Sequence, residues 1–182
     1  MRFAFNERKT AQAAAHLLKL SGGVLPYMHL IKLLFLADRA TLLKHGQPIT
    51  GAWMVSMHHG PVLSEVLDLI NGEGNRDGAW VATIGPAQGY DVALKVPEPE
   101  MDELSRFELK VLAAVYERYG RMNMWDLVNW LHDNIPEWKD PGRSMSGIAF
   151  EDVLRANRVS EEEIAGIDAE AESAWKVASL RR

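Results

Sequence analysis

The chain has 182 residues, 47% hydrophobic and 25% charged, a composition typical of a globular protein rather than a disordered one. Its 20 Lys and Arg residues against 25 Asp and Glu residues give a formal net charge of −5, which argues against a protein that coats nucleic acid through a cationic surplus. Cysteine is absent, which excludes disulfides, cysteine-based zinc sites and thiol nucleophiles.

Apolar residues spaced three and four apart predict helices along most of the chain. In order, the predicted helices cover residues 7–20, residues 26–44, a segment opening at Gly60-Pro61 and closing at Asn71-Gly72, a segment capped by Asp102, a segment capped by Asn123, residues 150–156, and a last helix opened by the capping pair Ser160 and Glu163.

Three short runs, residues 52–57, 80–84 and 90–96, predict strands. The sequence therefore predicts an α+β fold that is mainly α-helical, a compact helical domain with a small antiparallel sheet of about three strands. We expect one domain over residues 1–182. No run of apolar residues is long enough to span a membrane, and the polar residues 6–9 stand where a signal peptide needs an apolar stretch, so we expect a cytoplasmic protein.

The second predicted helix is apolar around most of its circumference, which is typical of a helix in the centre of a fold. Only Lys32 and Arg39, seven positions apart, form a polar line along it. Asp38 falls inside an apolar stripe, and a buried carboxylate there must be paired or protonated. It is either a general base or metal ligand, or a structural acceptor for a nearby strand or loop. We favour the structural role and expect hydrogen bonds from residues 47–61.

Adjacent histidines, His58 and His59, precede Gly60-Pro61. They could contribute to a metal or anion site, but neighbouring strand residues point to opposite faces and would not both bind one ion. We therefore expect one histidine to pack inward against Asp38 and the other to be exposed. His132 is interpreted as a packed histidine. The sequence contains no nucleophile elbow, Walker A sequence or dinucleotide-binding glycine pattern.

Three motifs occur in a fixed order between Lys32 and Gly72, and a weaker one follows. They are Lys32-Leu33-Leu34 with Leu36-Ala37-Asp38-Arg39, then GQPITG at residues 46–51, then His59-Gly60-Pro61-Val62 with Ser64, and finally Leu131-His132 with Pro136 and Trp138. In these motifs the chain resembles the Panacea domain, the SocA-like antitoxin family.

The resemblance implies a bacterial or phage antitoxin that binds a cognate toxin protein directly, and some such antitoxins act as adaptors that present the toxin to an ATP-dependent protease. It implies no enzymatic activity, and we expect no catalytic residues, cofactor or bound metal. The residues expected to hold the motif together or to meet the partner are Asp38, Arg39, His59, Gly60, Pro61 and Trp138. Exposed tryptophans, Trp138 ahead of Trp130, are the expected anchors.

Two other classes remain open. The first is a small hydrolase or metal-dependent enzyme that uses Asp38 with His58 or His59 and His132. The second is a DNA-binding regulator, although no helix carries clustered Lys and Arg residues. We expect a toxin protein and, in the adaptor version, a protease as partners, and we expect neither a membrane nor nucleic acid.

Overall fold

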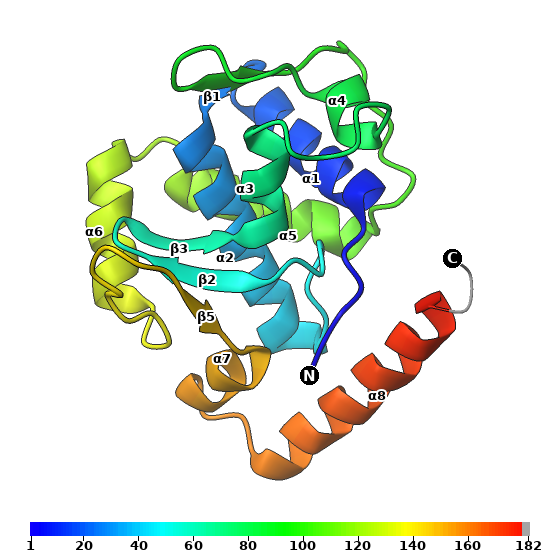
Figure 1. Ribbon diagram of the computed structural model, residues 1–182, viewed down its shortest axis with the longest axis vertical. Coiled ribbons are helices and arrows are strands. Elements are labelled where there is room, and N and C mark those ends of the chain that lie inside the picture. The colour runs from blue at the N-terminus through cyan, green and yellow to red at the C-terminus, as the bar shows by residue number, and fades with distance from the viewer. Residues whose placement is uncertain (180–182) are drawn as a thin grey trace.

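The structure, a computed structural model, describes residues 1–179. Over this range the chain is mainly helical, with two small antiparallel sheets, which confirms the predicted α+β class (Figure 1). The helices are α1 (Glu7–Leu20), α2 (Tyr27–His45), α3 (Ser64–Ile70), α4 (Ala79–Thr83), α5 (Arg106–Tyr119), α6 (Met124–Asn134), α7 (Phe150–Ala156) and α8 (Glu161–Ser179). The strands are β1 (Val24–Pro26), β2 (Met54–Met57), β3 (Gly60–Leu63), β4 (Asp91–Ala93) and β5 (Ser146–Ile148).

Helix α2 lies at the centre, as its apolar sequence predicts. Helices α1, α5 and α7 and strand β3 all pack on it, so nearly every face of α2 is covered by protein (Figure 1). It ends at Gly46, which adopts the left-handed conformation with φ 70° and donates its N–H to the carbonyl of Leu42. A central helix covered in this way leaves little solvent for the polar side chains it carries.

The strands form two sheets rather than the single sheet that the sequence predicts. The order β3-β2-β5 makes a three-stranded sheet, and β1 pairs with β4 in a separate ribbon. Residues 80–84, predicted as a strand, lie mostly in the short helix α4, where the Trp80 N–H donates to the Glu7 carboxylate of α1. Both sheets are antiparallel.

The segment that begins at Gly60 is a strand before it is a helix. Gly60 pairs with Met57 and Pro61 with Ser56, so β2 and β3 form a hairpin, and α3 begins only at Ser64. Pro61 is tolerated there because β3 is the edge strand of its sheet. The prediction that a helix opens at Gly60-Pro61 is therefore wrong, because residues 60–63 form strand β3 and the helix follows it.

Helix ends follow local capping chemistry. Asn123 caps α6 as predicted, accepting from the Trp125 N–H. The predicted cap Asp102 is wrong: Ser105 caps α5 in a reciprocal capping box with Glu108. Asp102 instead accepts hydrogen bonds from side chains of α1, Arg8 among them.

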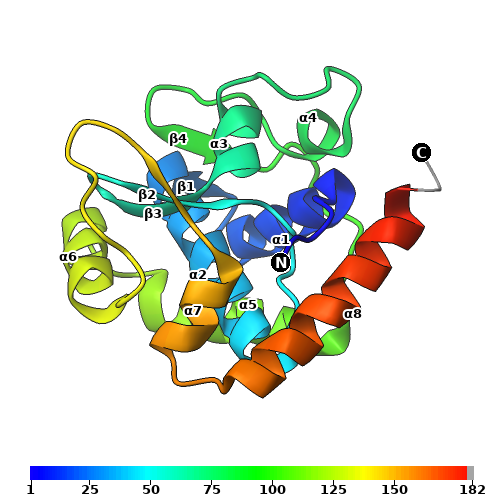
Figure 2. The same cartoon turned by 60° about the horizontal axis from the view of Figure 1, so that its bottom comes forward.

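Helices α6 and α8 lie on opposite sides of α2 (Figures 1 and 2). The N-terminus contacts α8, because the Met1 ammonium lies 3.1 Å from Asp168 and the Arg2 guanidinium lies 3.5 Å from the centre of the Trp175 ring. Over residues 161–177 of α8, Ile164 and Ala171 are buried. Within residues 1–179 no helix combines the length and the apolarity that crossing a bilayer requires.

Candidate functional site

Asp38 holds the central helix to the segment ahead of β2. Its side chain is fully buried, and it accepts hydrogen bonds from the N–H of Ile49 at 2.9 Å, the N–H of Thr50 at 3.0 Å and the Thr50 hydroxyl. Thr50 Oγ1 in turn accepts from the Ala52 N–H at 3.0 Å. The predicted bonds from residues 47–61 are confirmed. Burial raises the pKa of Asp38 to about 7, and these hydrogen bonds act against the rise.

The GQPITG motif shapes this segment around Asp38. Gly51 has φ +71°, and a Cβ on it would lie 2.4 Å from the carbonyl oxygen of Ala4. Only glycine therefore lets the N-terminal segment pass so closely. That segment is fixed by the Asn6 N–H, which donates to the Thr50 carbonyl at 3.0 Å. The motif thus joins α2, the approach to β2 and the N-terminus.

Arg39 is also held inside the fold. Its guanidinium donates to the Glu137 carboxylate, one contact being 3.2 Å, and to the Asn157 side chain at 2.9 Å. The Glu137 side chain is fully buried. These contacts join α2 to the loop after α6 and to the end of α7, so Arg39 has a structural role in this arrangement.

Both His58 and His59 are exposed, and the prediction that one packs inward against Asp38 is wrong. The physical reason is the hairpin register: Met57 pairs with Gly60, so the two histidines are the turn residues and not part of either strand. His58 Nδ1 lies 3.4 Å from the Asp140 carboxylate. The His59 ring meets the Trp125 ring edge to face, with 5.3 Å between centroids.

Lys32 lies beneath this turn and is fully buried, although its spacing from Arg39 predicts a polar line along the helix. Its ammonium donates one long hydrogen bond, 3.4 Å, to the Pro61 carbonyl, and no carboxylate within residues 1–179 forms an ion pair with it. Burial lowers the pKa of Lys32 to about 8. The sequence feature that indicates this burial is the apolar circumference of residues 26–44, which is typical of a helix covered on nearly every side.

Gly60 explains the His-Gly-Pro motif. It has φ +92°, and a Cβ on it would lie 3.2 Å from Lys32 Nζ and 3.7 Å from His132 Nε2. The missing side chain lets the ammonium and the imidazole approach the turn from two sides. His132 is half-buried, its Nε2 has no hydrogen-bond partner among the described residues, and burial together with the Lys32 charge lowers its pKa.

Trp138 belongs to the interior more than to the surface. Its ring stacks on that of His132, with centroids 3.9 Å apart and planes 5° apart, and its Nε1 donates to the Met57 carbonyl at 3.1 Å. Trp138 is half-buried, so the expectation that it is exposed is wrong, and Trp130 is half-buried as well; the role of either in partner binding stays a prediction. Of the described tryptophans, Trp53 and Trp125 are the ones exposed, at 52% and 58%.

Exposed groups gather at the turn end of the three-stranded sheet. We call this the hairpin edge; it comprises His58, His59, Trp125, Asp140 and Met145. Met145 is 65% exposed and precedes Ser146, which pairs with Ser56 close to the turn. Figure 1 shows α6 and the loop that follows it beside the β2–β3 turn.

The enzyme alternative required Asp38 to meet the histidines. Asp38 instead bonds to Ile49 and Thr50, whereas His58 bonds to Asp140. Across residues 1–179 no three His, Asp or Glu side chains are grouped so that they could hold a metal ion. Most motif residues are thus buried or half-buried, and His59 is the motif residue that lies on the hairpin edge.

The fold and the site together define a mainly helical α+β protein whose motif residues fix a central helix beside an exposed hairpin edge. The family described as antitoxin SocA-like, Panacea domain, matches residues 30–139, and the chain belongs to this family. The match runs from α2 to the loop after α6 and includes both Lys32 and the hairpin. It supports an antitoxin role. Comparison with curated proteins and with solved structures finds no match.

Proposed function

We propose that the protein is the antitoxin of a bacterial or phage toxin–antitoxin pair, and that it neutralises its toxin by binding it, without chemistry. Membership of the Panacea family supports the antitoxin role. The observation that carries the binding mechanism is the hairpin edge, where an exposed tryptophan and two exposed histidines lie within the matched residues. We further propose that residues 1–182 act as one domain in the cytoplasm.

Trp125 is the proposed central anchor of the toxin interface. Tryptophan is enriched among residues that dominate binding energies, because it buries a large area and loses little conformational freedom. The indole ring of Trp125 contacts the His59 ring edge to face, and 58% of the residue stays exposed. His58 and Asp140 add polar groups at the rim. The net charge of −5 favours a basic partner, since opposite charge speeds encounter.

The buried motif residues serve this surface indirectly. Asp38 and Arg39 fix α2 against its neighbours, while Gly60 and Pro61 set the turn that displays His59. Variants of these four residues are expected to weaken toxin binding together with stability. Variants of Trp125 are expected to weaken binding alone.

Co-expression with the product of the adjacent gene tests the proposal. We expect this product to arrest growth alone, the protein to restore growth, and the two to co-purify. Trp125→Ala is expected to lose rescue, whereas Trp53→Ala, the matched control, keeps it. Rescue without a complex at micromolar concentrations, through turnover of a small molecule, would favour an enzyme instead.

The same cells distinguish masking from delivery to an ATP-dependent protease. In the masking version the toxin's half-life is unchanged or longer when the antitoxin is present. In the adaptor version the complex forms and the toxin disappears faster, and deletion of the protease abolishes that acceleration. A pulse-chase measurement of toxin half-life with and without the antitoxin decides between them.

A further inference from the structure

A notch lies where helices α2, α5 and α6 meet, and no residue of the hairpin edge lines it. Its volume is about 290 Å³, close to the lower limit of the roughly 300–1,000 Å³ typical of ligand sites. The buried residues of its lining are Leu36, Val115 and Tyr119. Trp130 of α6 is half-buried beside them, with its ring centroid 4.7 Å from that of Tyr119. The lining is therefore mostly apolar and partly aromatic.

Arg118 lies at the aromatic side of this notch with its charge unmatched. Its guanidinium carbon is 5.1 Å from the centre of the Tyr119 ring and 5.7 Å from the centre of the Trp130 ring. The side chain is exposed, and no carboxylate within residues 1–179 forms an ion pair with it. All five of its N–H donors are thus without a hydrogen-bond acceptor among the described residues.

Two further donor groups line the same notch. The Tyr119 hydroxyl forms no hydrogen bond with a described residue. Arg39 uses its Nε and Nη2 atoms to bind Glu137 and Asn157, which leaves the two N–H groups of its Nη1 unused. Burial raises the pKa of the Tyr119 phenol, and the charges of Arg118 and Arg39 act against that rise, so both cations lie within electrostatic reach of the hydroxyl. No described residue that lines the notch is acidic.

We propose that this notch binds a monocarboxylate with an aromatic body. The carboxylate accepts hydrogen bonds from the Arg118 guanidinium and the Tyr119 hydroxyl, and the aromatic body lies against the Trp130 ring. This ligand site is separate from the proposed toxin anchor Trp125, and it does not depend on toxin binding.

The charge balance of the notch favours a single negative charge. The charge of Arg39 is matched by the Glu137 carboxylate, so Arg118 is the lining cation that lacks a counter-charge within the described residues. A planar guanidinium donates two parallel N–H groups to one carboxylate. A phosphate dianion would bring a second charge against a mostly apolar lining, which is costly. An aromatic body gains a ring–ring contact with Trp130 in addition to the area that it buries.

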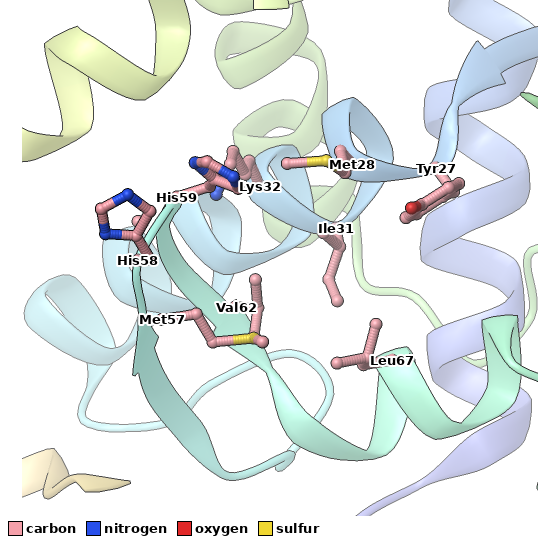
Figure 3. A pocket seen from close by; sticks show the side chains of 10 residues that line it. Tyr27, Met28, Ile31, Lys32, Met57, His58, His59, Val62 and Leu67 are labelled. Carbon is pink, nitrogen blue, oxygen red and sulfur yellow. The ribbon is translucent and has the colours of Figure 1, made fainter. Parts of the chain in front are cut away.

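The other pocket beside α2 has no accessible permanent cation. It lies between α2 and the β2–β3 hairpin, and Figure 3 shows mostly apolar side chains along its wall, with Lys32 and the two turn histidines at one end. Lys32 has no exposed surface, so a ligand in that pocket cannot reach its ammonium. Arg118 is exposed, and its donors are open to a ligand in the notch.

Two sources supply this chemistry: a free arylalkanoic acid, or the C-terminal carboxylate of a peptide that ends in phenylalanine. The probes are 3-phenylpropanoate, its uncharged analogue 3-phenylpropanamide, inorganic phosphate, and a short peptide ending in phenylalanine with either a free or an amidated C-terminus. Binding is measured by NMR chemical-shift titration of the full chain. We expect the acid to saturate with a Kd of about 1 mM, given its few heavy atoms.

Three comparisons test the site. The amide is expected to bind the unaltered protein about tenfold more weakly than the acid, because it loses the charge-assisted hydrogen bonds. Arg118→Met is expected to lose a similar factor, while Arg106→Met, which removes an exposed arginine of the same helix outside the notch, leaves the affinity unchanged. Ala114→Phe adds a ring at an exposed lining position and keeps Arg118, and it is also expected to lose binding.

Each outcome supports or overturns the proposal. Tighter binding of the free-carboxylate peptide than of the acid assigns the site to a chain terminus, and the reverse order assigns it to a small acid. Equal binding of acid and amide overturns the proposal, as does binding of phosphate as tight as that of the acid. Retained affinity in Arg118→Met also overturns it, and circular dichroism verifies that this surface variant is folded. Failure of both the acid and the peptide to bind at about 10 mM, tenfold above the expected Kd, overturns it as well.

Discussion

Asp38→Ala tests whether the buried carboxylate holds α2 to the approach of β2. The substitution leaves the N–H groups of Ile49 and Thr50 without an acceptor in a region closed to solvent. Each unsatisfied buried donor costs about 1–3 kcal/mol, and loss of one partner of a buried polar group costs a similar total. We therefore expect the free energy of unfolding at pH 7 to fall by about 3 kcal/mol.

The stability lost in Asp38→Ala is expected to change with pH in a defined direction. Burial raises the pKa of Asp38 from 3.8 to about 7, so the native state binds this proton more tightly than the unfolded chain does between those values. The contribution of Asp38 to the stability of the parent protein is greatest below about pH 4 and falls as pH rises toward 7. The Ala variant lacks that slope, so the difference between parent and variant is larger at pH 5 than at pH 8.

Urea unfolding followed by far-UV circular dichroism measures both quantities. Asp38→Asn is the matched control, because its amide oxygen still accepts from the two N–H groups, and we expect it to lose less stability than Asp38→Ala. An Ala variant that unfolds at the parent's urea midpoint, or a difference that grows from pH 5 to pH 8, would refute the reasoning.

The other predictions concern three further buried contacts. Lys32→Met is expected to raise the free energy of unfolding at pH 7 by about 3 kcal/mol, since burial lowers the pKa of Lys32 from 10.5 to about 8 and each unit corresponds to ~1.4 kcal/mol. The gain shrinks as pH rises from 8 to 10.5, because in that range the lysine loses its proton in the native state before it does in the unfolded chain. Thermal melts of parent and variant at pH 7 and pH 10 check this. Gly51→Ala is expected to cost about 1–3 kcal/mol, because φ is +71° and its Cβ would meet the Ala4 carbonyl at 2.4 Å; an unchanged melting temperature would show that the segment can move. Arg39→Met is expected to cost about 3–5 kcal/mol by leaving the buried Glu137 carboxylate unpaired, and the double variant with Glu137→Met is expected to recover most of that loss in the same denaturation assay.

Long periodic segments of the fold were predictable from the sequence. The helices at residues 7–20 and 26–44 were located within one residue, and Asn123 was identified as a cap, because helical spacing and capping chemistry are local properties. The run 80–84 was not predictable as a helix. A five-residue apolar stretch has no distinguishing period, and the Glu7 carboxylate that accepts from Trp80 is brought there by the fold.

The site was predictable only in part, for a similar reason. Burial of Asp38 followed from its place in an apolar stripe, and the structure confirms it. The orientation of His58 and His59 depended on the hairpin register, which a Gly-Pro pair does not reveal. The apolar circumference of residues 26–44 already indicated that Lys32 is buried, but that strand β3 is the segment covering it is a contact that the sequence alone does not place.

The most direct test of the account is the affinity of the purified protein for the purified product of the adjacent gene, measured by isothermal titration calorimetry with the parent, Trp125→Ala and Trp53→Ala. The account predicts a complex with a micromolar or lower Kd, weakened at least tenfold by Trp125→Ala and unchanged by Trp53→Ala. Absence of a complex at micromolar concentrations would contradict neutralisation by binding. Equal affinity of the parent and Trp125→Ala would contradict the assignment of the hairpin edge as the toxin-binding surface.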